Sequence, residues 1–203
     1  MSVTLHLDTP SSYNGEIHSS HAQKWEEAIG SELKKMDSME VWTEVPKRKE
    51  SSLLGTRWVF TVKRDPDGII MQYKACIAVQ GHRQIKELNF DETFAPTPTF
   101  TSLECLFSTE TAFGLPIQTF DVTATYLHSE LAEDIYINPP PGLKLQIGSV
   151  LNLNKALYDL KQARRFWWQH LTLFLYQIMK TRAFICTRKG KIGLSCRCTL
   201  IMM

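Results

Sequence analysis

The sequence predicts an α+β fold, because one stretch has the apolar spacing of a helix and the next has the alternation of a β-hairpin. The helical stretch begins near His21, where apolar residues recur at three- and four-residue steps between charged ones: Trp25, Ala28, Ile29, Leu33 and Met36. Residues 56–64 alternate as a strand does, residues 65–68 read Asp-Pro-Asp-Gly, and residues 69–79 supply a return strand. The turn sequence between two such runs predicts a hairpin.

The remaining elements are shorter and are separated by proline-containing segments at residues 96–98 and 139–141. Between these segments we expect a helix over about 101–113, a strand that ends near Asp121 and a short strand at 135–137. A last amphipathic helix is expected over about 155–179. Residues 1–20 are polar and lack periodicity, so we expect a flexible tail there.

Composition sets limits on the class of protein. A hydrophobic content of 43% with 22% charged residues is typical of globular domains and excludes wholesale disorder. The chain has neither a signal-peptide pattern nor an apolar run of about 20 residues, so we expect a soluble, intracellular protein with no membrane partner. The five cysteines lack the spacing of a zinc site; Cys196 and Cys198, for example, are too close together.

The net charge of +2 hides a strong asymmetry along the chain. Residues 161–203 contain nine Lys or Arg and no Asp or Glu, whereas residues 1–160 contain 14 basic and 21 acidic side chains. Such a basic segment is typical of a surface that faces nucleic acid. A tail translated out of frame would also have an accidental composition, and both interpretations stay open.

Asp121 is the most informative single residue. It stands in Phe-Asp-Val-Thr-Ala-Thr-Tyr-Leu, a carboxylate among mostly apolar residues at a strand end. A carboxylate in such a setting is costly to bury unless it meets a cation or a hydrogen-bond donor. Asp121 is therefore a candidate metal ligand.

A series of further segments accompanies Asp121 in a fixed order. These are Trp25-Glu-Glu-Ala28, Arg57-Trp-Val-Phe60, Lys63-Arg-Asp-Pro-Asp-Gly68, Tyr73-Lys-Ala75, Gly81 with Gln84, Phe90-Asp-Glu-Thr-Phe-Ala-Pro96, Ile135-Tyr-Ile137, Pro140-Pro-Gly142, Lys155-Ala-Leu-Tyr158 and Leu160-Lys-Gln-Ala163 with Trp167. In order and spacing the chain resembles the reverse transcriptases of Ty1/copia retrotransposons from about residue 23 to 179. The resemblance implies reverse-transcriptase fingers followed by an incomplete antiparallel palm around Asp121, a truncated version of the right-hand polymerase fold.

The resemblance also implies roles for single residues. Asp121 would be the first carboxylate ligand of Mg²⁺, the cofactor of two-metal nucleotidyl transfer, and Val122 would offer its backbone carbonyl. Tyr126 would exclude a sugar 2′-hydroxyl, and Gln162 would pack beside the incoming nucleotide. Lys74 would contact the triphosphate, with a solvent-facing strand lysine as the equal alternative. The implied partners are an RNA or DNA template-primer and a dNTP.

This sequence also departs from the family pattern. The family usually has Arg at Cys76, Ala at Thr125, Gly at Ser129, Gly at Asp159 and Pro at Arg164. Ser129 and Asp159 would then occupy positions where the freedom of Gly at positive φ is needed. The family's Tyr-x-Asp-Asp turn should fall near residues 200–203, which read Leu-Ile-Met-Met.

Three segments follow from these observations: a flexible polar tail at 1–20, a partial reverse-transcriptase domain at 21–183, and a divergent tail at 184–203, for which an out-of-frame origin stays open. The sequence predicts a polymerase remnant without catalytic activity. The alternative is a non-catalytic fragment that binds nucleic acid through the basic segment 161–197.

Overall fold

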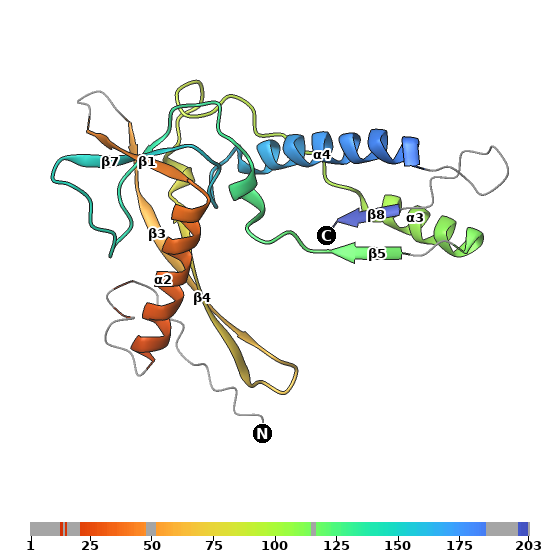
Figure 1. Ribbon diagram of the computed structural model, residues 1–203, viewed down its shortest axis with the longest axis horizontal. Helices are drawn as coiled ribbons and strands as arrows, with labels where there is room; N and C mark the ends of the chain where they lie inside the picture. Colours follow the sequence, from red (N-terminus) through yellow and green to blue (C-terminus); the bar gives the residue numbers. More distant parts are fainter. Residues whose placement is uncertain are drawn as a thin grey trace.

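A computed structural model describes residues 13, 15, 21–47, 52–114, 117–185 and 199–202 (Figure 1). The helices are α2 (Ala22–Ser38), α3 (Phe100–Phe113) and α4 (Ala163–Ile185), with 3₁₀ turns η1 (Gly81–Arg83) and η2 (Thr125–His128). The strands are β1 (Trp42–Pro46), β2 (Leu53–Leu54), β3 (Thr56–Arg64), β4 (Ile70–Val79), β5 (Ile117–Phe120), β6 (Tyr136–Ile137), β7 (Ser149–Leu153) and β8 (Thr199–Met202). This mixture of helices and sheets is consistent with the predicted α+β class.

Helix α2 and the β3–β4 hairpin form where the sequence predicts them. The hairpin closes through the Asp65–Gly68 turn, in which Gly68 has a φ of 83° and the backbone N–H of Ile69 donates to the Asp65 carboxylate over 2.8 Å. A positive φ at this position is the reason a glycine suits the turn. Helix α2 lies along the hairpin (Figure 1), and its Trp25 ring meets the Tyr73 ring edge-on at a centroid distance of 4.8 Å.

A four-stranded sheet with the order β1-β7-β6-β2 stands beside the hairpin. Strands β1 and β7 pair antiparallel, so that Trp42 faces Leu153 and Pro46 faces Ser149. The sequence pattern predicted neither β1 nor β7. The pairing joins segments about 100 residues apart, and Pro46 closes the last position of an edge strand, where a missing N–H is tolerated.

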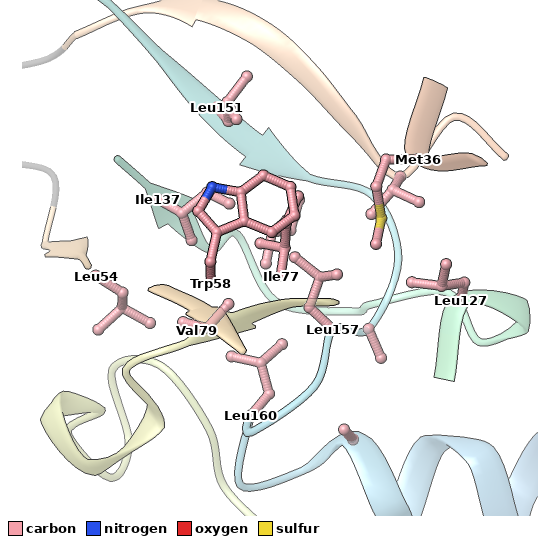
Figure 2. Packing of buried hydrophobic residues seen from close by; sticks show 14 of the residues in the cluster. Met36, Leu54, Trp58, Ile77, Val79, Leu127, Ile137, Leu151, Leu157 and Leu160 are labelled. Atoms are coloured by element: carbon pink, nitrogen blue, oxygen red, sulfur yellow. The ribbon is translucent and has the colours of Figure 1, made fainter. Parts of the chain in front are cut away.

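The main core fills the space between α2, the hairpin and this sheet. Trp58 stands near its centre, with Ile77, Ile137 and Leu151 around it (Figure 2). Several core side chains have no exposed surface at all, among them Met36, Ile77, Leu127, Ile137 and Leu157. Burial of this apolar area is the main force that holds the three elements together.

Helix α3 and strand β5 form a separate arm of the molecule. The Thr99 hydroxyl accepts a hydrogen bond from the Ser102 N–H over 3.2 Å at the start of α3, and Gly114 ends the helix at a φ of 60°. Strand β5 pairs with β8 in parallel, with Ile117 opposite Thr199 and Phe120 opposite Met202. An antiparallel palm around Asp121 was expected, and this expectation is wrong for these strands; the long connection through α4 permits the parallel arrangement.

The last helix begins eight residues later than the sequence predicted. Residues 155–162 form other structures: Lys155 bridges to Glu130, Tyr158 bridges to Ala78, and Asp159 has a φ of 68°. A left-handed residue cannot continue a right-handed helix, so α4 starts only at Ala163. None of the helices in the described ranges is long and apolar enough to span a membrane.

Candidate functional site

Asp121 directly follows β5 and is exposed to solvent. The chain then turns through residues 122–124 into η2, with Ala124 in the left-handed region at a φ of 57°. A non-glycine residue at positive φ is uncommon, so the turn after Asp121 is tightly determined by its surroundings. The strand beside β5 ends in Leu200, Ile201 and Met202, none of which carries a carboxylate.

Val122, the second predicted metal ligand, is half-buried, and its carbonyl is already engaged. The Thr125 hydroxyl donates to the Val122 carbonyl over 2.7 Å. The ring nitrogen Nε2 of His128 lies 3.2 Å from the Thr123 carbonyl. Side chains within residues 125–128 thus supply hydrogen-bond partners for the carbonyl groups that follow Asp121.

Tyr126 lies in η2 and is half-buried against the core. Its ring meets the Tyr158 ring edge-on at a centroid distance of 5.5 Å. Burial, followed by the neighbouring Cys76, Glu32 and Tyr126, raises the pKa of Tyr158 to about 12. The Tyr158 phenol therefore stays protonated at neutral pH, and the two rings form a neutral aromatic contact.

Lys74 is half-buried on β4, with Cys76 two residues along on the same face of the strand. Burial and the negative charge of Glu32 raise the pKa of the Cys76 thiol, against the smaller opposing effects of Lys74 and Lys35. Glu32 is 3% exposed and pairs with Lys35. A neutral thiol therefore lies near Lys74, at a position where the family that the sequence resembles usually has an arginine.

Gln162 is completely buried at the start of α4. Its carbonyl oxygen Oε1 accepts a hydrogen bond from Gln84 Nε2 over 3.0 Å, and its Nε2 donates to the Asn89 backbone carbonyl over 2.8 Å. Gln84 Oε1 also accepts from the Lys161 N–H over 2.8 Å. This network fastens the loop after β4 to the start of α4, a role that the type of residue alone does not reveal.

Two of the substituted glycine positions have different outcomes. Asp159 has a φ of 68°, as expected for a position that suits glycine, and its carboxylate pairs with Arg57 over 2.7 Å. Ser129 has a φ of −104°, so the expectation of a positive φ there is wrong. A Cβ atom at Gly81 would come within 1.8 Å of the Asp159 carbonyl oxygen, so this close approach of two backbones requires glycine.

The structure places the predicted site residues in separate settings. The Tyr126 ring contacts the Tyr158 ring, and the backbone of Tyr158 forms a β-bridge with Ala78 of β4. Of the side chains that the structure describes, none forms a hydrogen bond or an ion pair with Asp121. Nor do the described ranges contain a group of three His, Cys, Asp or Glu residues that could hold a metal ion. The described residues thus do not fit the Mg²⁺ pair that the sequence resemblance implies.

The comparison with known families gives a clear result. Residues 39–197 match the family described as reverse transcriptase (RNA-dependent DNA polymerase). The chain therefore belongs to the reverse transcriptase family.

The curated relatives specify the branch of that family. The chain is 33% identical over 87% of its length to a retrovirus-related Pol polyprotein from transposon RE1 of Arabidopsis thaliana. It is 36% identical over 71% of its length to the Pol polyprotein from transposon TNT 1-94 of Nicotiana tabacum, and 26% identical over 93% to a Ty1 Gag-Pol polyprotein of Saccharomyces cerevisiae. It is a copia-type reverse transcriptase domain fragment.

The match covers only a small part of each relative. The aligned region is 12% of the RE1 polyprotein, 10% of the TNT 1-94 polyprotein and 12% of the yeast polyprotein. No solved structure matches the chain significantly.

Proposed function

We propose that this chain is a remnant of a retrotransposon RNA-directed DNA polymerase domain that does not catalyse nucleotidyl transfer. The observation that carries the proposal is the pairing of β5 with β8. The strand that precedes Asp121 lies beside a strand ending in Leu-Ile-Met, so the neighbour in register offers no second carboxylate. Two-metal transfer needs carboxylates that hold two ions close together.

Other groups near Asp121 are poor substitutes for the missing carboxylates. Met202 has a thioether, a soft ligand that does not suit Mg²⁺. Glu130 belongs to a backbone bridge with Lys155, and Glu133 lies further along the same connection. Neither acid comes from a strand adjacent to β5 among the described residues.

The expected result is that the purified 203-residue chain extends no primer on poly(rA)·oligo(dT), with either Mg²⁺ or Mn²⁺. Incorporation of labelled dTTP measures the reaction, with the same preparation of Asp121→Asn as the matched control. Extension above background that disappears in Asp121→Asn would overturn the proposal. It would mean that carboxylates outside the described residues complete the site.

The proposal includes the arrangement of the chain. Residues 21–183 are the fingers and the beginning of a palm in a truncated right-hand polymerase fold. The polar tail expected at residues 1–20 lies outside the described residues apart from Tyr13 and Gly15, and most of the divergent tail expected at residues 184–203 lies outside them as well. The long β3–β4 hairpin packed against α2 supports a fingers subdomain. Asp121 at the end of β5 supports the beginning of a palm.

A second candidate function is binding of nucleic acid without chemistry, through the basic segment 161–197. The charge of residues 161–203, nine basic groups and no acidic one, favours it. Arg164 and Lys180 on α4 are exposed, whereas Arg165 pairs with Glu92 and Lys161 donates to the Gln84 carbonyl. Lys180 Nζ lies over the Tyr176 ring, 4.7 Å from its centroid, so among the cations of this segment whose side chains the structure describes, Arg164 is the one best placed to meet phosphate.

Salt dependence tests this second candidate. Binding to a fluorescein-labelled single-stranded oligonucleotide should weaken steeply as the KCl concentration rises from about 50 to about 200 mM. The reason is that each phosphate that the protein neutralises releases a counterion. Arg164→Gln should lower the slope by about one phosphate contact, and Arg165→Gln serves as the control at a cation already paired with Glu92. Weak binding that does not saturate, with an affinity that Arg164→Gln leaves unchanged, would contradict this second candidate function.

A further inference from the structure

Helix α3 presents an apolar face to solvent. Phe100 and Phe107 are 76% and 45% exposed, and the exposed Glu104 lies between them in the sequence. Because these three positions are spaced i, i+4 and i+7, the two rings and the carboxylate lie on one side of the helix, the α3 face. None of the extensive contacts between described helices and strands involves α3. An exposed apolar surface of this kind, with a charge inside it, is typical of an interaction site.

The outer part of α4 repeats this pattern with the opposite charge. Leu171 is the last buried side chain that the structure describes on α4, and beyond it the helix projects from the body (Figure 1). Leu173 and Tyr176 are 64% and 56% exposed, and Lys180 Nζ lies 4.7 Å from the centroid of the Tyr176 ring. The spacing i, i+3 and i+7 places Leu173, Tyr176 and Lys180 on one side of α4, the α4 face.

The charges of the two helices determine which surfaces match. Helix α3 contains two glutamates and no Lys or Arg, whereas α4 contains four Lys or Arg and no Asp or Glu. Two copies of the α3 face would oppose their carboxylates, and two copies of the α4 face would oppose their ammonium groups. Complementary charges select the correct partner surface and orient it. The α3 face is therefore matched by the α4 face.

The exposed apolar area is sufficient for a weak, specific dimer. A fully buried aromatic side chain removes about 150–250 Å² from solvent, so the exposed parts of the four apolar side chains on the two faces amount to roughly 450 Å² per copy. Two copies together would bury roughly 900 Å², and Glu104, Lys180 and their neighbours bring the total to about the 1,000 Å² that a specific interface needs. An interface at this lower limit corresponds to a weak dimer.

We propose that the chain forms a symmetric dimer in which the α3 face of each copy packs against the α4 face of the other, with Glu104 opposite Lys180 at both contacts. A two-fold axis makes the two contacts equivalent and closes the assembly at two copies. The inference concerns association alone and does not depend on whether the chain catalyses nucleotidyl transfer.

Sedimentation velocity of the full chain tests the proposal. At about 100 µM, well above the dissociation constant of a micromolar dimer, the mass of two chains is expected. Glu104→Lys and Lys180→Glu each place like charges at both contacts, so each should raise the dimer Kd by at least about tenfold. Glu26→Lys makes the same charge change at an exposed position of α2 and should leave the Kd unchanged.

Mixing the two charge-reversed variants makes the test specific. In a dimer of Glu104→Lys with Lys180→Glu, one contact pairs the two substituted side chains and the other keeps the original Glu104 and Lys180. An equimolar mixture should therefore dimerise like the unsubstituted chain, and this rescue would also show that both variants are folded.

Three results would overturn the proposal. The first is a chain that stays monomeric, as it would if a segment of a longer polyprotein covered these faces. The second is self-association with a Kd that neither charge reversal changes, which would indicate unspecific apolar contact. The third is a mixture that does not dimerise although each variant alone is monomeric.

Discussion

The body of the molecule and the arm that carries Asp121 differ in how completely their apolar side chains are buried. The body consists of α2, the hairpin, the four-stranded sheet and residues 155–162, which contribute to the same core. In it, Ile77 and Leu157 have no exposed surface. In the arm, Phe100 and Phe113 at the two ends of α3 are 76% and 74% exposed, and the buried residue of α3 is Glu110. The body closes its own core, whereas α3 leaves large apolar side chains in contact with solvent.

This difference bears on the proposed loss of catalysis. Lys74 and Gln162 lie in the body, whereas Asp121 directly follows β5. Strand β5 lies beside β8 in the arm (Figure 1). Substitutions on α3 have little core to disrupt, since Glu110 is the one buried side chain of that helix. A polymerase-derived chain can therefore lose the geometry of its metal site and keep a folded body.

The largest effect should come from a core truncation in the body. Ile77→Ala removes three buried carbons at a fully buried position and should lower the free energy of unfolding by about 2–5 kcal/mol. Phe113→Ala removes a larger side chain from the exposed end of α3 and should change it by less than about 0.5 kcal/mol. Urea denaturation followed by tryptophan fluorescence measures both values. Equal losses would mean that the arm is packed as well as the body.

A smaller effect is expected from the hydrogen-bond network that joins the loop after β4 to the start of α4. Gln162→Leu keeps a buried side chain of similar size but leaves Gln84 Nε2 and the Asn89 carbonyl without a main partner. Unpaired buried groups of this kind should lower the free energy of unfolding by about 2 kcal/mol. Gln72→Leu, at an exposed position of β4, is the matched control. Should the two substitutions prove equally mild in the same urea experiment, the network does not fasten α4 to the loop.

The hairpin and helix α2 were predicted to within a residue or two because local signals specify them. The Asp-Pro-Asp-Gly turn and the alternation of residues 56–64 act over a few positions, and Trp25 and Met36 mark the buried stripe of α2. The family membership was likewise predicted from the order of local motifs, and the match over residues 39–197 confirms it.

The failures share a dependence on distant parts of the chain. Strands β1 and β7 form because the segments that contain Trp42 and Leu153 pair with each other, and no local sequence pattern predicts this pairing. The start of α4 depends on the left-handed Asp159 and on the close approach of its carbonyl to Gly81. The burial of Gln162 depends on Gln84 and Asn89, and each residue of β5 pairs with a residue of β8 that lies 82 positions further along the chain. The predicted roles of Lys74, Tyr126 and Gln162 toward a nucleotide stay predictions.

The smallest expected effect is a gain of stability at Ser129, which joins η2 to the body. Its side chain is 1% exposed, and its hydroxyl has no hydrogen-bond partner. Ser129→Ala removes that cost without altering the backbone bonds to Tyr126 and Ala156, so it should raise the free energy of unfolding by about 1 kcal/mol.

Two further substitutions make the measurement at Ser129 decisive. Ser129→Gly should gain less than Ser129→Ala, because a φ of −104° needs no glycine and the more flexible residue loses more entropy on folding. Ser108→Ala, at an exposed position of α3, should change stability by less than about 0.5 kcal/mol. Thermal unfolding followed by circular dichroism compares the three variants. If Ser129→Gly proves the most stable, then this position still favours the residue that the family usually has there, and the turn after Asp121 adopts a backbone that only glycine accommodates without strain.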